Sequence, residues 1–240
     1  DLVRSRGLGD VYKRQSESHA LLAGLAGASV AINGGFGGID LAQINKVLLG
    51  LLFSSAVGFV CGYGTSKATV AAFSGIERDK SEGFFKISQI ASSAVMAFMH
   101  GAQDTQKFAG VLTLEMLMMG GGRAGEWVFP VCAVIMSLGT ALGGGRIIKT
   151  VGIDMIKMQT YQGFAADVAG GFCLFLSTVF GFPVSTTHTK TTAVMGVGAA
   201  KSLRSVDWSV AGDMAAAWIF TFPGCGILGW LISCIYLRVF

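Results

Sequence analysis

The stretch Gly181-Phe-Pro-Val-Ser-Thr-Thr-His188 interrupts a long apolar run, and a related stretch, Ser16-Glu-Ser-His19, lies near the start of the chain. A proline followed by Ser and Thr predicts that one helix ends and a new helix begins with hydroxyl side chains at its N-terminus. Each histidine is followed eight residues later by a glycine, Gly27 or Gly196. This recurring order predicts two copies of one structural unit.

The two copies keep a nearly constant offset. It is 169 residues between the histidines and 167 between Asp40 and Asp207, and a long apolar run follows each aspartate. The copies therefore differ by a two-residue change in one loop. Residues 87–180 precede the second copy and have no counterpart before Ser16, so we expect the first copy to have lost its beginning.

The composition places the chain in a membrane. Of its 240 residues, 52% are hydrophobic and only 13% are charged, whereas a soluble domain carries about 25% charged residues. The 35 glycines suit close helix packing in lipid. Basic residues stand between apolar runs, as membrane-edge anchors do, so lipid is an expected partner and nucleic acid is not. The five cysteines lie inside apolar runs without metal-binding spacing.

The apolar runs predict an all-α integral membrane protein with broken helices and re-entrant hairpins. We expect helix breaks at residues 101–107 and 182–187, and spans at 41–63, 127–142, 163–180 and 208–237. The expected divisions are a non-native or truncated lead at 1–15, the end of an N-terminal repeat at 16–66, a polar linker at 67–86 and a C-terminal repeat at 87–240.

Duplicated halves with broken helices are typical of secondary transporters, in which helix ends supply partial charges at membrane depth. Ser185, Thr186 and Thr187 would place hydroxyls and free backbone N–H groups at one point, which favours an anion. The alternative is that these residues only cap a helix. Their occurrence in two related copies favours the anion site.

Asp104 is the strongest single candidate for a functional residue, because an ionisable group in an apolar run is energetically costly and usually functional. With Gln103 and Gln106 it forms an oxygen-rich cluster suited to a small cation, and Asp167 is a weaker candidate for the same network. The alternative is an ion pair between Asp104 and Lys107 at i, i+3, which can coexist with a functional role. Four residues are expected to contact these ligating side chains without touching the phosphate or the cation themselves: His100, Lys107, His19 and His188.

Three segments together resemble one known family. HGAQDTQKFAGV at 100–111 and GFPVSTTHTKTTAVMGVGAAK at 181–201 look like the C-terminal repeat of the inorganic phosphate transporter (PiT) family, and SESHALLAGLAGA at 16–28 looks like the end of its N-terminal repeat. The resemblance implies an all-helical inverted repeat that moves phosphate together with sodium ions or protons. The family's N-terminal Gly-x-Asn-Asp motif is absent, which implies a fragment.

The resemblance also implies residue roles. Phosphate contacts are implied for Ser185, Thr186, Thr187, Ser16 and Ser18, although Glu17 between the last two is awkward beside an anion. Cation contacts are implied for Gln103, which stands where Asn is usual, for Gln106, and for Asp104, which would hold sodium if the coupling ion is sodium.

The expected function is cation-coupled symport of inorganic phosphate by alternating access, with no cofactor beyond the coupling ion. Importing an anion against the membrane potential costs about 2.3 kcal/mol per charge per 100 mV, so a cation must travel in the same cycle. The choice between sodium and proton stays open, as does a homo-oligomer. The expected location is a prokaryotic inner membrane. The alternatives are a non-transporting structural membrane fragment and a membrane-embedded serine hydrolase that uses Ser185 with His188.

Overall fold

The computed structural model describes residues 16–76, 78–120, 125–149, 158–182 and 184–239. Within these ranges the chain is helical and contains no strand. The lead at residues 1–15 lies outside the described residues. The helices are α2 (Glu17–Asn33), α3 (Leu41–Phe73), α4 (Arg78–Met118), α5 (Val128–Lys149), α6 (Thr160–Phe180), α7 (Thr186–Lys201) and α8 (Trp208–Val239), with short 3-10 turns η1 (Phe36–Gly38) and η3 (Leu203–Ser205).

Polar side chains set the starts of three of these helices. Ser16 and Ser185 are the N-caps of α2 and α7, and each hydroxyl accepts a hydrogen bond from the backbone N–H three residues later. Asp40 caps α3 by accepting from the N–H groups of Ala42 and Gln43 at 2.9 and 3.3 Å. These bonds satisfy backbone donors that a helix leaves unpaired in its first turn.

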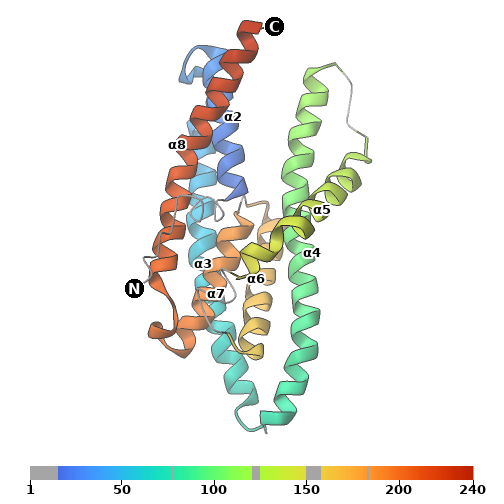
Figure 1. Cartoon of the computed structure of the whole chain (residues 1–240), viewed down its shortest axis with the longest axis vertical. Coiled ribbons are helices and arrows are strands. Elements are labelled where there is room, and N and C mark those ends of the chain that lie inside the picture. The colour runs from blue at the N-terminus through green and yellow to red at the C-terminus, as the bar shows by residue number, and fades with distance from the viewer. Residues whose placement is uncertain (1–15, 77, 121–124, 150–157, 183, 240) are drawn as a thin grey trace.

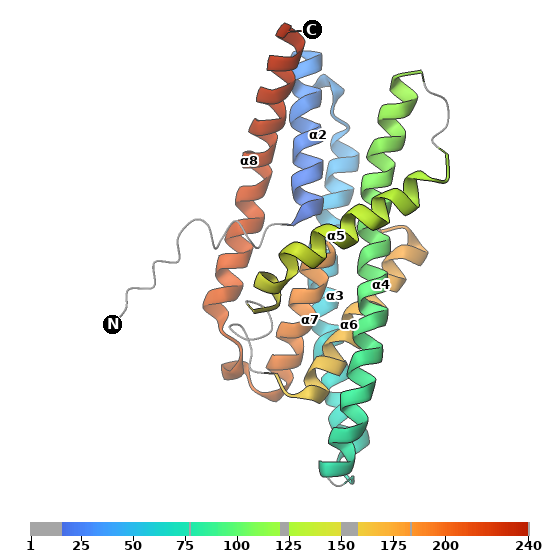
Figure 2. The same ribbon diagram turned by 45° about the vertical axis from the view of Figure 1, so that its right-hand side comes forward.

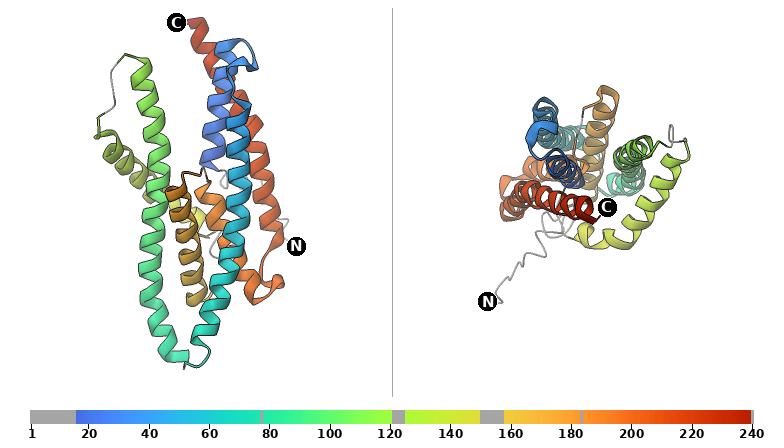
Figure 3. Two further views of the ribbon diagram at one scale, coloured as in Figure 1. Left: turned by 180° about the vertical axis from the view of Figure 1, so that it is seen from behind. Right: turned by 90° about the horizontal axis from the view of Figure 1, so that it is seen from above.

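The helices form a group of four with two further helices beside it. α2 packs along α8, and α7 packs along α3. Figure 1 shows α2 above α7, with α3 and α8 running past both. α6 contacts α3, α7 and α4, and it joins this group to α4 and α5. α5 crosses α4 obliquely (Figure 2), and the view from above in Figure 3 shows both standing to one side.

Glycines allow the close contacts within the group of four. A Cβ on Gly27 would overlap the Gly226 carbonyl oxygen, and a Cβ on Gly196 would overlap the Phe59 carbonyl oxygen. Gly196 and Gly27 are 169 residues apart, and Gly226 and Phe59 are 167 apart. These are the two offsets of the sequence repeat, so corresponding residues make corresponding contacts. Small residues at such interfaces let helix backbones approach closely in a membrane.

Three helical segments are long and apolar enough to cross a membrane: Leu41–Phe73, Thr160–Phe180 and Ala215–Val239. The first two confirm the expected spans at 41–63 and 163–180 with wider bounds, and the third overlaps the expected span at 208–237 but begins later, at Ala215. The expected span at 127–142 corresponds to a shorter apolar helical segment, Val128–Leu142. Large apolar side chains remain exposed along α3 and α8, including Leu52 at 70% and Ile219 at 70%. Such an outer surface is suited to lipid and not to water.

The expected helix break at residues 101–107 is wrong. α4 continues without interruption from Arg78 to Met118. His100, Gln103, Asp104 and Lys107 recur at i, i+3, i+4 and i+7, so they lie on one helix face, and the segment contains no proline. Their polar atoms are satisfied by side chains, as described below, and the backbone has no need to open.

The second expected break is present with slightly different limits. α6 ends at Phe180, Gly181 takes a left-handed conformation with a φ of 66° that is typical of a helix end, and α7 begins at Thr186. Thr186 and Thr187 therefore belong to the helix and not to the break. Residues 67–86, expected as a linker, are mostly helical: α3 continues to Phe73 and α4 starts at Arg78.

Candidate functional site

The N-terminal ends of α2 and α7 meet near the middle of the molecule. The Ser16 and Ser185 hydroxyls, which cap these two helices, are hydrogen-bonded to each other at 2.8 Å and are both buried. Ser18 in the first turn of α2 donates to the Val184 carbonyl at 3.5 Å. Each helix end carries about +0.5 charge and unpaired N–H groups. The fold thus brings together two positive helix ends from distant parts of the sequence.

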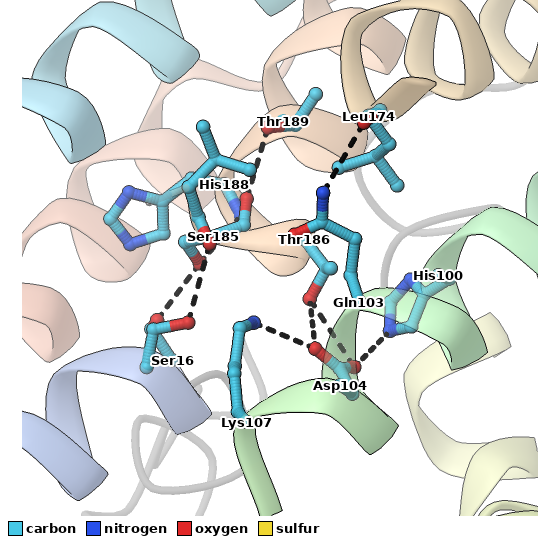
Figure 4. A network of polar contacts seen from close by, with 12 residues as sticks. Ser16, His100, Gln103, Asp104, Lys107, Leu174, Ser185, Thr186, His188 and Thr189 are labelled. Carbon is cyan, nitrogen blue, oxygen red and sulfur yellow. Dashed lines mark hydrogen bonds and ion pairs between the residues drawn. The ribbon is translucent and has the colours of Figure 1, made fainter. Parts of the chain in front are cut away.

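Asp104 of α4 lies beside these helix ends and is only 2% exposed. Its Oδ1 is 2.8 Å from the Lys107 ammonium, and its Oδ2 is 3.1 Å from His100 Nε2. The Thr186 hydroxyl of α7 donates to the same carboxylate at 3.2 and 3.4 Å (Figure 4). Three side chains thus contact the carboxylate, and the expected i, i+3 ion pair with Lys107 is present.

Gln103 lines the cavity and also contacts α6. Its amide Nε2 donates to the Thr178 hydroxyl at 2.7 Å and to the Leu174 carbonyl at 3.2 Å, both on α6. Gln103 thus ties α4 to α6. A buried hydrogen bond of this kind contributes about 0.5–1.5 kcal/mol to stability, and leaving its partners unpaired costs more.

A cavity of about 400 Å³ adjoins this cluster. Its polar wall includes Ser18 of α2, Gln103, Gln106 and Lys107 of α4, and Thr178 of α6. A water molecule takes about 30 Å³, so there is space for a tetrahedral oxyanion beside this polar wall. Apolar side chains, among them Leu21, Val47 and Phe182, form much of the rest of the lining. Ser185 and Thr186 are not part of the lining, because both are buried behind it at 1% and 3% exposure.

The surroundings of Asp104 do not fit a sodium ion in this arrangement. Sodium needs oxygen lone pairs, whereas Lys107 offers only N–H donors and a positive charge. A second cation about 4 Å from the ammonium would be disfavoured by about 4 kcal/mol at an effective dielectric constant of 20. The oxygen-rich cluster expected from the sequence is therefore already occupied by a side-chain cation.

The remaining predicted residues lie at varying distances from this cluster. Gln106 is exposed to the cavity and Thr187 is half-buried in the first turn of α7. Asp167 accepts a short hydrogen bond from Ser93 of α4, eleven residues before Asp104. That separation is about 16 Å along a helix, so the structure does not bring Asp167 together with Asp104.

The two histidines contact each other and not the expected ligands. The His19 and His188 rings lie 4.6 Å apart, and His188 Nδ1 is 3.3 Å from the Ser55 hydroxyl. Ser185 accepts from the His188 backbone N–H, not from its ring. The hydroxyl and imidazole that a serine hydrolase would pair are thus engaged elsewhere.

Three residues beside the histidines were not predicted from the sequence. Ser55 contacts the ring of His188, and Phe222 lies edge-on to the ring of His19 at 4.7 Å. Ser55 and Phe222 are 167 residues apart, which is the second offset of the repeat. That offset is a signal that could have found them. Trp218, stacked on His188 at 3.5 Å, had no such signal.

Comparison with known proteins decides the family. The profile described as "Phosphate transporter family" matches residues 66–229, which is more than half of the chain. The chain belongs to the phosphate transporter family. Members of this family and the named relatives are transporters, not enzymes, and the matched region includes Asp104, Lys107 and all of α7.

Relatives in this family agree with the match. A probable low-affinity inorganic phosphate transporter of Bacillus subtilis is 33% identical over 218 residues, covering 89% of this chain and 65% of the relative. A protein of the same description from Mycobacterium leprae is 34% identical over 229 residues, covering 92% and 55%. The chain therefore spans between half and two thirds of the length of these relatives.

A solved structure shows the same fold. It is titled "The sodium-dependent phosphate transporter" and superposes with a TM-score of 0.61 at 20% sequence identity. The superposition covers 92% of this chain and 65% of the other.

Proposed function

We propose that this chain carries the phosphate-binding part of a cation-coupled inorganic phosphate symporter in a prokaryotic inner membrane. The single observation that supports this most is the meeting of two capped helix ends, Ser16 to Ser185 at 2.8 Å, beside a cavity that Lys107 lines. Two helix N-termini and an ammonium supply the positive charge and donors that a tetrahedral oxyanion requires.

The proposed phosphate contacts fall into two groups. Ser18 and Lys107 line the cavity, and in this proposal they are the first contacts. Ser185, Thr186 and Thr187 contribute when the two helix ends separate, because Thr186 now donates to Asp104 and Ser185 to or from Ser16. Binding phosphate between the ends would compensate for the hydrogen bonds that this separation breaks.

The proposed transport cycle uses an inverted repeat. α2 and α7 point away from each other from a common junction (Figure 1), and their glycine contacts to α8 and α3 match residue for residue. These observations support two halves related by an approximate two-fold axis in the membrane plane. Rocking of one half against the other would expose the junction to alternate sides, and the gradient of the coupling ion, sodium or proton, would drive the cycle.

Uptake of radiolabelled phosphate into liposomes that contain the purified chain tests this proposal. A cation gradient should drive accumulation, and the double substitution Thr186→Val with Thr187→Val should weaken phosphate binding. Loss of donors to a buried oxyanion costs about 1–3 kcal/mol, or roughly five- to 150-fold in affinity. Thr113→Val is the matched control, because its hydroxyl only bonds the Ala109 carbonyl on α4.

The outcomes separate the alternatives. Phosphate binding without uptake would indicate a non-transporting membrane fragment. Covalent labelling of Ser185 by a fluorophosphonate would indicate a hydrolase. Equal phosphate affinity in the double variant and in Thr113→Val would show that the hydroxyls of α7 only cap the helix.

A further inference from the structure

We propose that Lys107 is a built-in cation of the phosphate site: its ammonium occupies the position beside Asp104 that a free sodium ion would otherwise take. Phosphate would then bind without sodium at this carboxylate. The inference rests on the proposed function for its phosphate consequence, but the occupancy of the cation position can be tested without phosphate.

The geometry of the pair carries the inference. Lys107 Nζ lies 2.8 Å from Asp104 Oδ1, and the two residues are one helical turn apart on α4. The ammonium is therefore held at the carboxylate by its own helix. The side chain of Asp104 is 2% exposed and that of Lys107 is 20% exposed, so water screens the pair only weakly.

Both oxygens of the carboxylate are already used. Oδ1 receives Lys107, Oδ2 faces His100 Nε2 at 3.1 Å, and the Thr186 hydroxyl donates to the carboxylate as well. A metal ion that enters here must displace at least one of these donors and approach a fixed positive charge. The ammonium is attached to the same helix, so it loses no translational entropy when it pairs with Asp104, whereas a sodium ion must be bound from solution. The ammonium therefore holds the position in competition with sodium.

A cation is needed at this position for phosphate to bind nearby. A carboxylate repels an oxyanion unless an opposite charge stands between them. Lys107 lies between the Asp104 carboxylate and the cavity, because it pairs with Asp104 and also lines the cavity with Gln103 and Gln106. An ammonium has three donors, so one can remain on Asp104 while the others face the cavity.

The other ionisable neighbours do not change this reasoning. His100 lies on the far oxygen of Asp104 and is 36% exposed. Glu17, in the first turn of α2, interacts electrostatically with Asp104, Lys107 and His100, so it adds negative charge to this region and supplies no cation. Lys107 is therefore the only positive charge in direct contact with both Asp104 and the cavity, among the residues that the structure describes.

Thermal unfolding of the purified chain without phosphate is the first test. We expect any difference between the wild-type midpoints in sodium chloride and in choline chloride to be the same in Asp104→Asn, because sodium does not bind at this carboxylate. Lys107→Met keeps the side-chain length and removes the charge, so its midpoint should rise with sodium concentration until the site saturates. Adding Asp104→Asn to Lys107→Met should abolish that rise. Lys190→Met, an exposed lysine on α7, is the matched control and should behave as the wild type.

Phosphate affinity in the same two salts is the second test. The wild type and Lys107→Arg should bind phosphate equally, within about twofold, in sodium and in choline. Lys107→Met should lose at least about tenfold in choline and recover part of this loss in sodium, since one lost charge-assisted contact is worth that much.

Each outcome decides the matter. The proposal is overturned, whatever the phosphate result, if Asp104→Asn removes a stabilisation by sodium that the wild type shows, or if sodium stabilises Lys107→Met no more than the wild type. If no variant binds phosphate but the midpoints respond to sodium as expected, Lys107 remains the built-in cation and the proposed function fails instead. If Lys107→Met does not fold, the comparison of the wild type with Asp104→Asn in sodium and in choline decides alone.

Discussion

Gly196→Ala offers a quantitative test of the paired helix packing. A methyl group at Gly196 would overlap the Phe59 carbonyl oxygen and lie 2.9 Å from the Tyr63 backbone nitrogen. Because backbone atoms cannot swing aside as a side chain can, α7 and α3 must move apart. Overpacking of this kind costs about 1–3 kcal/mol.

The matched control is Gly64→Ala on α3, where an added Cβ meets nothing within 4 Å. Both substitutions gain up to about 1 kcal/mol from the better helix propensity of alanine, so the difference between the two variants isolates the packing cost. At about 2–4 °C per kcal/mol for a chain of this size, Gly196→Ala should unfold roughly 2–12 °C below Gly64→Ala.

The assay is thermal unfolding in detergent, followed by the fluorescence of the four tryptophans. Gly27→Ala, the counterpart of Gly196→Ala on α2, should lose a similar amount because its methyl would overlap the Gly226 carbonyl oxygen. Equal midpoints for Gly196→Ala and Gly64→Ala would refute the close contact, and with it the structural basis for relating the two copies.

Three further predictions concern the site and its helix. Replacing Ser16 and Ser185 by alanine, singly and together, should give a coupling energy of about 0.5–1.5 kcal/mol in unfolding, and additive losses would mean that the two hydroxyls are not bonded. Gln103→Leu should lower the free energy of unfolding by about 0.5–1.5 kcal/mol, because Thr178 loses the Gln103 donor but keeps its own hydrogen bond to the Leu174 carbonyl, and an unchanged midpoint would argue against the tie between α4 and α6. Gly101→Ala should raise stability by up to about 1 kcal/mol because α4 is continuous there with open space, whereas destabilisation would favour the broken helix.

Much of the fold could be predicted from the sequence, because a helix that spans a membrane requires a long apolar run. The spans in α3, α6 and α8 follow directly from them, and the repeat offsets of 169 and 167 even relate Gly27 and Gly196 to their packing partners. The break before α7 was predictable because proline, serine and threonine in succession are poor within a helix and good at its start.

The error in α4 has a specific cause. Polar residues within an apolar run suggest an opening of the backbone, but Lys107 and His100 contact Asp104 from the same helix. The i, i+3 spacing of Asp104 and Lys107 already indicates such a pair, because residues at that spacing lie on one helix face. Intrahelical pairing makes the polar cluster compatible with an unbroken helix.

The cavity was not predictable from local patterns. Its lining comes from α2, α3, α4 and α6, and the role of Gln103 depends on where α6 lies. Such contacts follow from tertiary packing, which no short motif encodes. For the same reason Asp167, a plausible partner of Asp104 by residue type, proved to lie beside Ser93 instead.

The most direct test of the central claim is whether bound phosphate touches the Lys107 ammonium. Solid-state NMR of the chain labelled with ¹⁵N-lysine can detect a dipolar coupling between that nitrogen and the ³¹P nucleus of bound phosphate. A charge-assisted contact places nitrogen and phosphate oxygen about 2.7–2.9 Å apart, so strong dephasing of the ³¹P signal is predicted, and Lys107→Arg should remove it while phosphate stays bound. A bound ³¹P signal that no lysine nitrogen dephases would contradict the account and place the phosphate away from the junction of α2, α4 and α7.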